Sequence, residues 1–95
     1  MNTPTTLQIL AATKNQKDGQ YLKIANLDDM KMLVVCGTAR LIKFYIMHPL
    51  YEGEDKCKMD FVFQAKRNTF TKRHTEFAIE YANQGKVQSE YMRNL

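Results

Sequence analysis

The sequence predicts a small α+β domain in which an antiparallel sheet of about four strands carries two helices on one face. Three observations support this prediction. Residues 39–48 and 57–65 alternate apolar and polar side chains, as half-buried strands do. Residues 69–83 place apolar side chains at helical spacing and run into the helix-stopping triplet NQG. The expected order is strand, strand, helix, strand, strand, helix, within one domain that spans residues 1–95.

The N-terminal part is expected to form a first hairpin. Residues 6–13 (TLQILAAT) alternate enough from Leu7 onward to form a strand, and residues 21–25 (YLKIA) are expected to return antiparallel to it. The polar segment between them contains Asp18-Gly19, a pair common in tight turns.

Two interpretations of residues 27–36 stay open. Asn26 is a suitable N-cap, Asp28 and Asp29 would fill a first helical turn, and Gly37 would follow a helix end. A strand through MLVVC is the alternative, because its two adjacent valines are β-branched. The capping residues at both ends favour a short helix.

The second hairpin has the clearest strand pattern. Its first strand directs Ile42, Phe44 and Ile46 to one face. Its second strand is expected to direct four residues to that same apolar face: Met59, Phe61, Phe63 and Ala65. The other set should point away: Lys58, Asp60, Val62 and Gln64. The last helix follows, and residues 1–5 and 87–95 are expected to fray, or 87–95 to add a short helix.

Composition indicates an ordinary globular domain, with 44% hydrophobic and 25% charged residues. A 95-residue chain buries a modest core, so pairing with a second copy would help to stabilise it. No apolar run reaches the roughly 20 residues of a membrane span, and the N-terminus lacks the pattern of a signal peptide. We therefore expect a cytoplasmic protein in which Cys36 and Cys57 are reduced thiols.

The net charge of +4 is unevenly distributed along the chain. Residues 1–55 hold six Lys or Arg and six Asp or Glu, whereas residues 56–95 hold eight and four. Half of the cations in the second part lie between residues 66 and 73. Such an asymmetry favours an anionic partner.

These clustered cations lie around the expected start of the last helix. They are Lys66, Arg67, Lys72 and Arg73, and His74 follows them. Cations at a helix N-terminus oppose the helix dipole, but together with the unpaired N–H groups of a first turn they form a phosphate site. The sequence therefore predicts a nucleic-acid-binding site here, with a solvated basic surface as the alternative.

Two further lysines would extend that site along the sheet. Lys43 and Lys58 flank Tyr45 in the expected hairpin, and Tyr45 would stack a base if this face of the sheet is open. The alternative is that Tyr45 packs against a partner protein.

A mixed apolar patch supports that alternative. Leu41, Tyr45, Met47 and Val62 are expected on the exposed face, and methionine is common at adaptable interaction surfaces. The patch would serve as a partner site or a homodimer interface. Otherwise it forms a second small core under the N-terminal hairpin.

No catalytic, metal or cofactor site is predicted. The soft ligands Cys36, His48, Cys57 and His74 form no CxxC or HxxxH pair, and the four glycines form no phosphate-binding loop. We therefore expect no cofactor and no enzyme activity.

The function that these features favour is that of a small, non-enzymatic basic protein that binds nucleic acid, with RNA preferred over DNA. The alternative is a protein-binding inhibitor or regulator, of the kind that viruses and mobile elements encode, whose basic patch docks on an acidic surface of a host protein or enzyme, alone or together with RNA. No membrane partner is expected.

Overall fold

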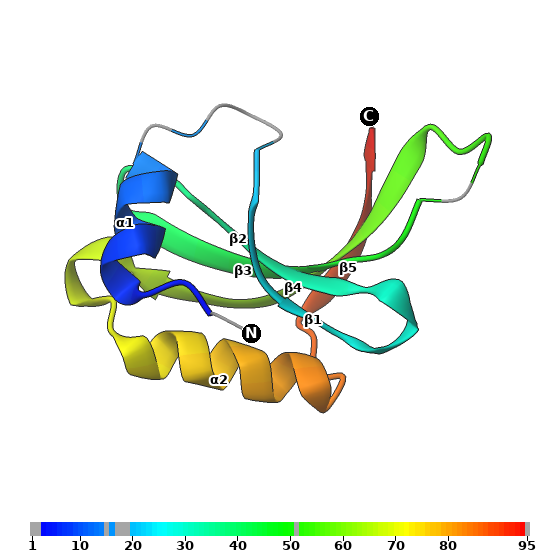
Figure 1. Cartoon of the computed structure of the whole chain (residues 1–95). Helices are drawn as coiled ribbons and strands as arrows, with labels where there is room; N and C mark the ends of the chain where they lie inside the picture. Colours follow the sequence, from blue (N-terminus) through cyan, green and yellow to red (C-terminus); the bar gives the residue numbers. More distant parts are fainter. Residues whose placement is uncertain (1–2, 15, 17–19, 51, 95) are drawn as a thin grey trace.

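The computed structural model describes residues 3–14, 16, 20–50 and 52–94, and of residues 91–94 it describes the backbone. Within these residues the chain forms α1 (Thr6–Lys14), β1 (Leu22–Asn26), β2 (Met32–Gly37), β3 (Leu41–Met47), β4 (Lys56–Lys66), α2 (Lys72–Asn83) and β5 (Ser89–Asn94). The strands make one antiparallel sheet in the order β1-β2-β3-β4-β5 (Figure 1). Each strand therefore pairs with the next one along the chain, and α2 lies in the connection between β4 and β5.

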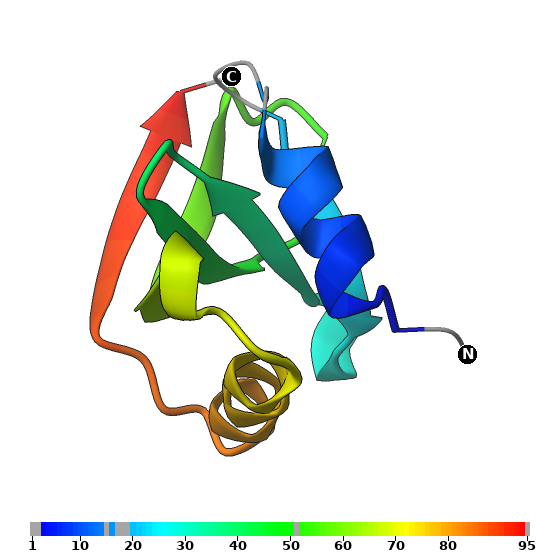
Figure 2. The same cartoon turned by 90° about the vertical axis from the view of Figure 1, so that its left-hand side faces the viewer.

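The predicted fold class is confirmed, although the sheet has five strands instead of about four. Ile9 of α1 and Ala78 of α2 belong to the same core cluster as Ile42 and Phe44 of β3. Both helices therefore pack on one face of the sheet, which we call the helix face. Figures 1 and 2 show α2 running along the sheet and α1 lying at the end formed by β1 and β2.

The prediction of a strand at residues 6–13 is wrong, because this segment forms α1. A capping box starts the helix: the Thr5 N–H donates to Gln8 Oε1 at 2.8 Å, and the Gln8 N–H donates to Thr5 Oγ1 at 3.2 Å. Its buried residues are Ile9 and Thr13, four positions apart, while Leu7 is 78% exposed. The segment therefore buries two residues at helical spacing, Ile9 and Thr13, and its apparent alternation of apolar and polar residues does not reflect a strand.

The prediction of a helix over residues 27–36 is also wrong, and the alternative of a strand is correct. β2 pairs with β1 on one side and β3 on the other. Leu33, Val34 and Val35 are all buried, since both faces of this strand are covered. Asn26 and Gly37 end strands and do not cap a helix.

The C-terminal segment is a strand and neither frays nor forms a helix within its described part. Gly85, at φ +71°, ends α2, and the Lys86 N–H donates to the Tyr81 carbonyl at 2.9 Å. The Gln88 N–H then donates to the Phe61 carbonyl at 2.7 Å and directs the chain along β4, where β5 pairs. The last helix begins at Lys72 and not at Thr69.

A β-bulge in β4 changes which residues share a face. Phe44 pairs with Phe63 and Tyr45 pairs with Phe61, so Val62 is the extra residue. Val62 is only 2% exposed and belongs to the main core. The expectation that Val62 points away from the core is therefore wrong, and so is the expectation that Phe61 shares a face with Phe63.

A second, smaller core lies on the opposite face of the sheet. Val34, Cys57 and Met59 are buried there, and partly buried side chains pack against them: Tyr21, Met32, Tyr45 and Met47. Of the four residues for which a second core was the alternative, Tyr45 and Met47 pack against this cluster, whereas Val62 belongs to the main core. This face, which carries no helix, is called the open face below.

The turn between β1 and β2 stores backbone strain. Asp29 and Met30 both adopt left-handed conformations, at φ +59° and +62°, and the Lys31 N–H closes the turn on the Asp28 carbonyl. Such a turn favours glycine at its second central position, where this chain has a methionine that is 82% exposed.

Replacing Met30 with glycine is therefore expected to stabilise the protein by about 1 kcal/mol, because the strain disappears while little packing is lost. Chemical denaturation of both proteins measures this difference. Met30→Ala is the matched control, since it removes the same side chain but keeps Cβ and its strain. Equal stabilisation by both changes would contradict the explanation.

Candidate nucleic-acid interface

Arg67 is engaged in hydrogen bonds that join three segments of the fold. Its Nε and Nη2 donate to the Thr38 carbonyl at 3.0 and 2.8 Å, and Nη1 donates to the Leu10 carbonyl at 3.3 Å. Nη2 also donates to the carbonyl and the hydroxyl of Thr13 at 3.2 and 3.1 Å. The Leu10 and Thr13 carbonyls lie at the C-terminal end of α1, where a cation is favourable. Arg67 therefore supports the fold, and the expectation that it contacts phosphate stays a prediction.

His74 also has a structural role. Its Nδ1 accepts a hydrogen bond from the Thr71 N–H at 3.0 Å, as part of the capping box that begins α2. The ring stacks against Phe63 and Phe70, with centroids 5.9 and 5.8 Å away. These contacts use the acceptor nitrogen and the ring of His74 within the fold, and its role in phosphate binding stays a prediction.

Lys72 and Arg73 remain exposed, but they lie on the helix side of the molecule. Lys72 lines a cavity of about 650 Å³ between the N-terminal end of α1 and one side of α2. The Arg73 guanidinium carbon lies 5.6 Å from the centre of the Phe77 ring. Both cations are accessible to an anion, at a distinct place from the lysines of the sheet.

Two lysines project from the open face of the sheet. Leu41 pairs with Lys66 and Lys43 pairs with Gln64, so these side chains alternate with the core residue Ile42. The first pair lines an outer depression of about 570 Å³, formed by Ala39, Arg40, Leu41, Lys66, Arg67 and Asn68. The second pair lines a central depression of about 230 Å³, formed by Lys43, Tyr45, Phe61, Gln64 and Ser89. The two depressions follow one another along β3 and β4.

Two aromatic residues, Tyr45 and Phe61, line the central depression. The Tyr45 and Phe61 rings lie 5.4 Å apart at 50°, and Tyr21 meets Tyr45 edge to face at 6.1 Å. Sequence reasoning missed Phe61, because only the bulge at Val62 brings it to this face. Arg40 and Gln64 were missed as well, although strict alternation already placed Gln64 opposite the core.

The four residues expected to form a partner patch do not lie together. Val62 is buried in the main core. Tyr45 and Met47 pack against the second core. Leu41 is half-buried and lines the outer depression. The structure therefore brings Leu41 and Tyr45 into successive depressions of the open face, and it removes Val62 from that surface.

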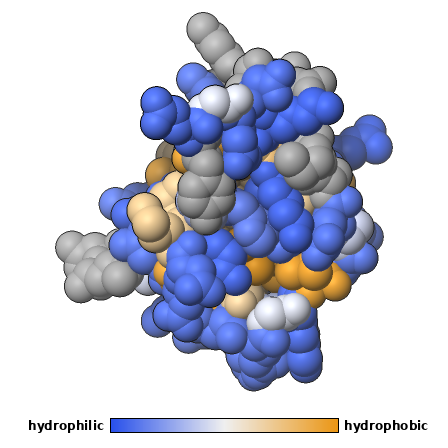
Figure 3. Space-filling view, turned by 90° about the vertical axis from the view of Figure 1, so that its right-hand side faces the viewer, coloured by the Kyte–Doolittle hydropathy of each residue, from blue (hydrophilic) through white to orange (hydrophobic). Residues whose placement is uncertain are grey.

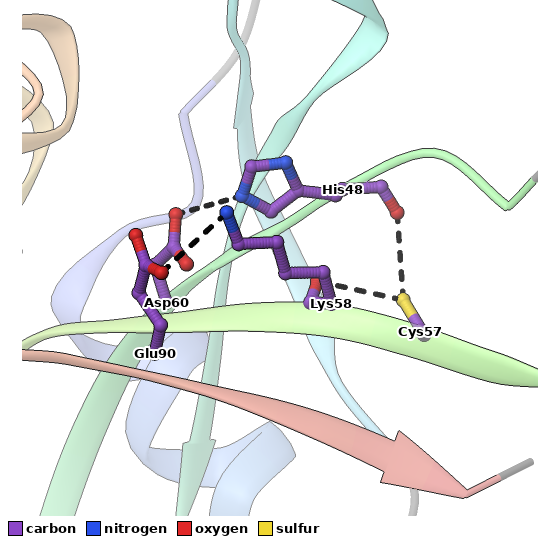
Figure 4. Close-up of polar contacts among 5 residues, drawn as sticks. All are labelled: His48, Cys57, Lys58, Asp60 and Glu90. Carbon is purple, nitrogen blue, oxygen red and sulfur yellow. Dashed lines mark hydrogen bonds and ion pairs between the residues drawn. The ribbon is translucent and has the colours of Figure 1, made fainter.

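Lys58 does not extend the lysines of the open face. Its Nζ lies 3.6 Å from Glu90 Oε2, beside the pair in which His48 Nε2 meets Asp60 Oδ2 at 2.7 Å (Figure 4). These four side chains lie on the helix-face side of β4, opposite the side of Met59. This corrects the expectation that Lys58 lies beside Lys43 and extends the predicted binding site along the sheet.

The polar cluster of Figure 4 offers limited chemistry. Asp60 is buried, and its Oδ1 has no hydrogen-bond partner in the described structure. Cys57 Sγ contacts the carbonyl of His48 at 3.4 Å and not its ring. Among the described residues, no group of three or more His, Cys, Asp or Glu side chains is placed to hold a metal ion. His48 and Asp60 therefore act as a pair that joins the end of β3 to β4.

Comparisons with known proteins found no matching family model, no matching curated protein and no matching solved structure. In the part of the chain that the structure describes, no helix has the length and apolar character needed to cross a membrane. Figure 3 shows the end of the molecule at which the chain passes from β3 to β4, where hydrophilic side chains dominate and hydrophobic ones emerge in small areas.

Proposed function

We propose that this protein binds single-stranded nucleic acid, RNA in preference to DNA, across the open face of its sheet. One observation carries the proposal: Lys43 and Lys66 project from the same face as the Tyr45 and Phe61 rings, in two successive depressions. Cations that neutralise phosphates beside rings that stack bases are the combination that single-strand binding requires.

The geometry favours single strands over duplexes. A ring that lines a depression reaches only bases that have left a helical stack, as they do in the loops and ends of RNA. The outer depression adds Arg40 to Lys66, so a phosphate on that side of a bound base meets positive charge. The helices lie on the other face, so neither α1 nor α2 covers these depressions.

The test is fluorescence anisotropy with labelled single- and double-stranded RNA and DNA at low and physiological salt. We expect the tightest binding to single-stranded RNA, with an affinity that falls steeply as salt rises. Replacing Lys43 and Lys66 with glutamate should weaken binding by at least about tenfold. It should also reduce the salt slope by about 1.4, the contribution of two phosphate contacts on a single strand.

A matched control carries the same change in charge on the helix side. Lys72→Glu with Arg73→Glu alters two exposed cations outside the open face, and it should retain most of the affinity. If this control abolishes binding while the open-face variant binds normally, the interface lies at the start of α2. If no nucleic acid binds even at low salt, the proposed function is wrong.

A further inference from the structure

We propose that the cavity between α1 and α2 binds a free α-amino acid with a branched aliphatic side chain. The cavity measures about 650 Å³ and lies between the N-terminal end of α1 and one side of α2 (Figure 1), a size common among sites for small molecules. Its lining combines one cation, one anion and an apolar wall. It lies on the helix side of the molecule, so this inference does not depend on the proposed function of the open face.

Two opposite charges line the cavity one helical turn apart. Lys72 and Glu76 are exposed on α2, and both belong to the lining. Among the described residues, no ion pair joins them to each other or to a third group. Their spacing of four residues places them on the same side of the helix. A ligand that carries a carboxylate and an ammonium group on one carbon atom can therefore meet both charges at once.

The first turn of α1 adds donors for the ligand carboxylate. The Gln8 N–H donates to Thr5 Oγ1 at 3.2 Å, whereas the N–H groups of Thr6 and Leu7 have no hydrogen bond to any other described residue. Thr6 and Leu7 both line the cavity. No acidic residue lies in this turn, so the positive end of the helix dipole is not neutralised within α1 and favours a bound carboxylate.

A buried hydroxyl group points independently to a polar ligand. Thr75 lines the cavity and is only 4% exposed, and its Oγ1 has no hydrogen-bond partner in the structure as described. A buried hydroxyl without a partner costs free energy, because it has lost its hydrogen bonds to water. A carboxylate that accepts a hydrogen bond from this hydroxyl removes that cost, whereas a purely apolar ligand does not.

The apolar wall favours an aliphatic side chain on the ligand. Pro4, Leu7 and Ile79 line the cavity, two from the segment that begins α1 and one from α2. Leu7 is 78% exposed, so a ligand side chain that covers it removes apolar surface from water. Leucine, isoleucine and valine provide such a side chain, and glycine does not.

The experiment is an NMR titration of isotope-labelled protein with four probes. Leucine carries all three features of the expected ligand. Isocaproate is leucine without its ammonium group, isoamylamine is leucine without its carboxylate, and glycine lacks the aliphatic side chain. We expect leucine to cause saturable shifts in the amides of residues 5–7 and 72–79. Each of the other probes should bind about fivefold more weakly, because it loses one exposed ion pair or the apolar contact.

Substitutions on α2 separate the contacts. Lys72→Met and Glu76→Gln should each weaken leucine binding by about fivefold. Thr75→Val should weaken it by about tenfold, since this hydroxyl is buried, and Thr75→Ser should retain most of the affinity. Arg73→Met and Glu80→Gln are the matched controls, because they change an exposed cation and an exposed acid of the same helix outside the cavity. Both controls should bind leucine like the wild-type protein.

Three results would overturn the amino-acid site. The first is the lack of a saturable shift up to about 10 mM leucine, which corresponds to a negligible affinity. The second is equal binding of leucine, isocaproate and isoamylamine. The third is unchanged leucine binding by the Lys72, Glu76 and Thr75 variants. The same spectra show whether each variant is folded. None of these results affects the proposed binding of nucleic acid, which is measured separately on the open face.

Discussion

Replacement of Arg67 with alanine is expected to destabilise the protein by about 3 kcal/mol. The change removes the hydrogen bonds from one guanidinium group to the carbonyls of Leu10, Thr13 and Thr38. Hydrogen bonds from charged groups contribute about 1.5–3 kcal/mol each, and partly buried acceptors without a donor carry a further cost. The contacts also join α1 to the turn before β3, so their loss separates two parts of the fold that are distant in the sequence.

Thermal denaturation followed by circular dichroism measures this effect. For a domain of this size, a loss of about 3 kcal/mol corresponds to a decrease in Tm of about 15 °C. Arg67→Lys should recover little of the loss, because an ammonium group cannot reach acceptors on both sides of a planar fork. Lys66→Ala, one residue earlier and exposed on the open face, should leave Tm nearly unchanged. Equal effects of the two alanine changes would contradict the structural role of Arg67.

The structural role of Arg67 limits which variants can test the proposed interface. A variant with all four cations from Lys66 to Arg73 reversed would unfold, because Arg67 belongs to the scaffold, and its failure to bind would not locate the proposed interface. Only variants that leave Arg67 intact report on the interface itself. Lys43 and Lys66 meet that condition.

Replacement of Gly37 with alanine is expected to cost about 2 kcal/mol. A Cβ at this position would lie 2.6 Å from Arg67 Nη2 and 2.9 Å from Thr13 Cβ, both closer than real Cβ contacts allow. The Gly37 N–H also donates to Gln16 Oε1 at 3.1 Å, so the strand cannot easily move away. Inserting one carbon into a packed site typically costs 1–3 kcal/mol, since neighbours must shift.

A double-mutant cycle tests the cause of that loss. In the Arg67→Ala background, Gly37→Ala should cost clearly less, because the nearest atom has been removed. Gly53→Ala is the control for backbone strain alone: Gly53 has φ +86°, and a Cβ there meets nothing within 4 Å. Additive effects of the Gly37 and Arg67 changes, measured by urea denaturation, would show that the close approach is not the cause.

The sequence pattern was sufficient to predict the second hairpin and the last helix, because in both of them buried and exposed residues alternate with the period of the element. The second hairpin was predictable because β3 is half-buried, so its side chains alternate between core and open face. The last helix was predictable because its buried residues recur at helical spacing. The uneven charge distribution likewise follows from the sequence alone, and it selects the class of partner that we propose.

The predictions for β2 and α1 were wrong because burial in the tertiary structure, and not the local sequence pattern, decides what these segments form. β2 is covered on both faces, so its continuous apolar run shows no alternation, and the capping residues beside it belong to turns. α1 buries only Ile9 and Thr13. With only two buried positions, the pattern of apolar residues does not distinguish a helix from a strand. The capping box at Thr5 and Gln8 was the one local signal that could have identified it.

The sequence by itself determined the fold class, the second hairpin, the last helix and the excess of positive charge. Only the tertiary structure decided which cations face solvent and which support the fold. Arg67 and Lys66 are neighbours in the chain, yet Lys66 ends β4 beside Leu41, whereas Arg67 follows the strand and donates to the Thr13 carbonyl of α1. The bulge at Val62 then brings Phe61 beside Tyr45. A pairing register and its irregularities depend on contacts between distant residues, so no local pattern in the sequence contains them.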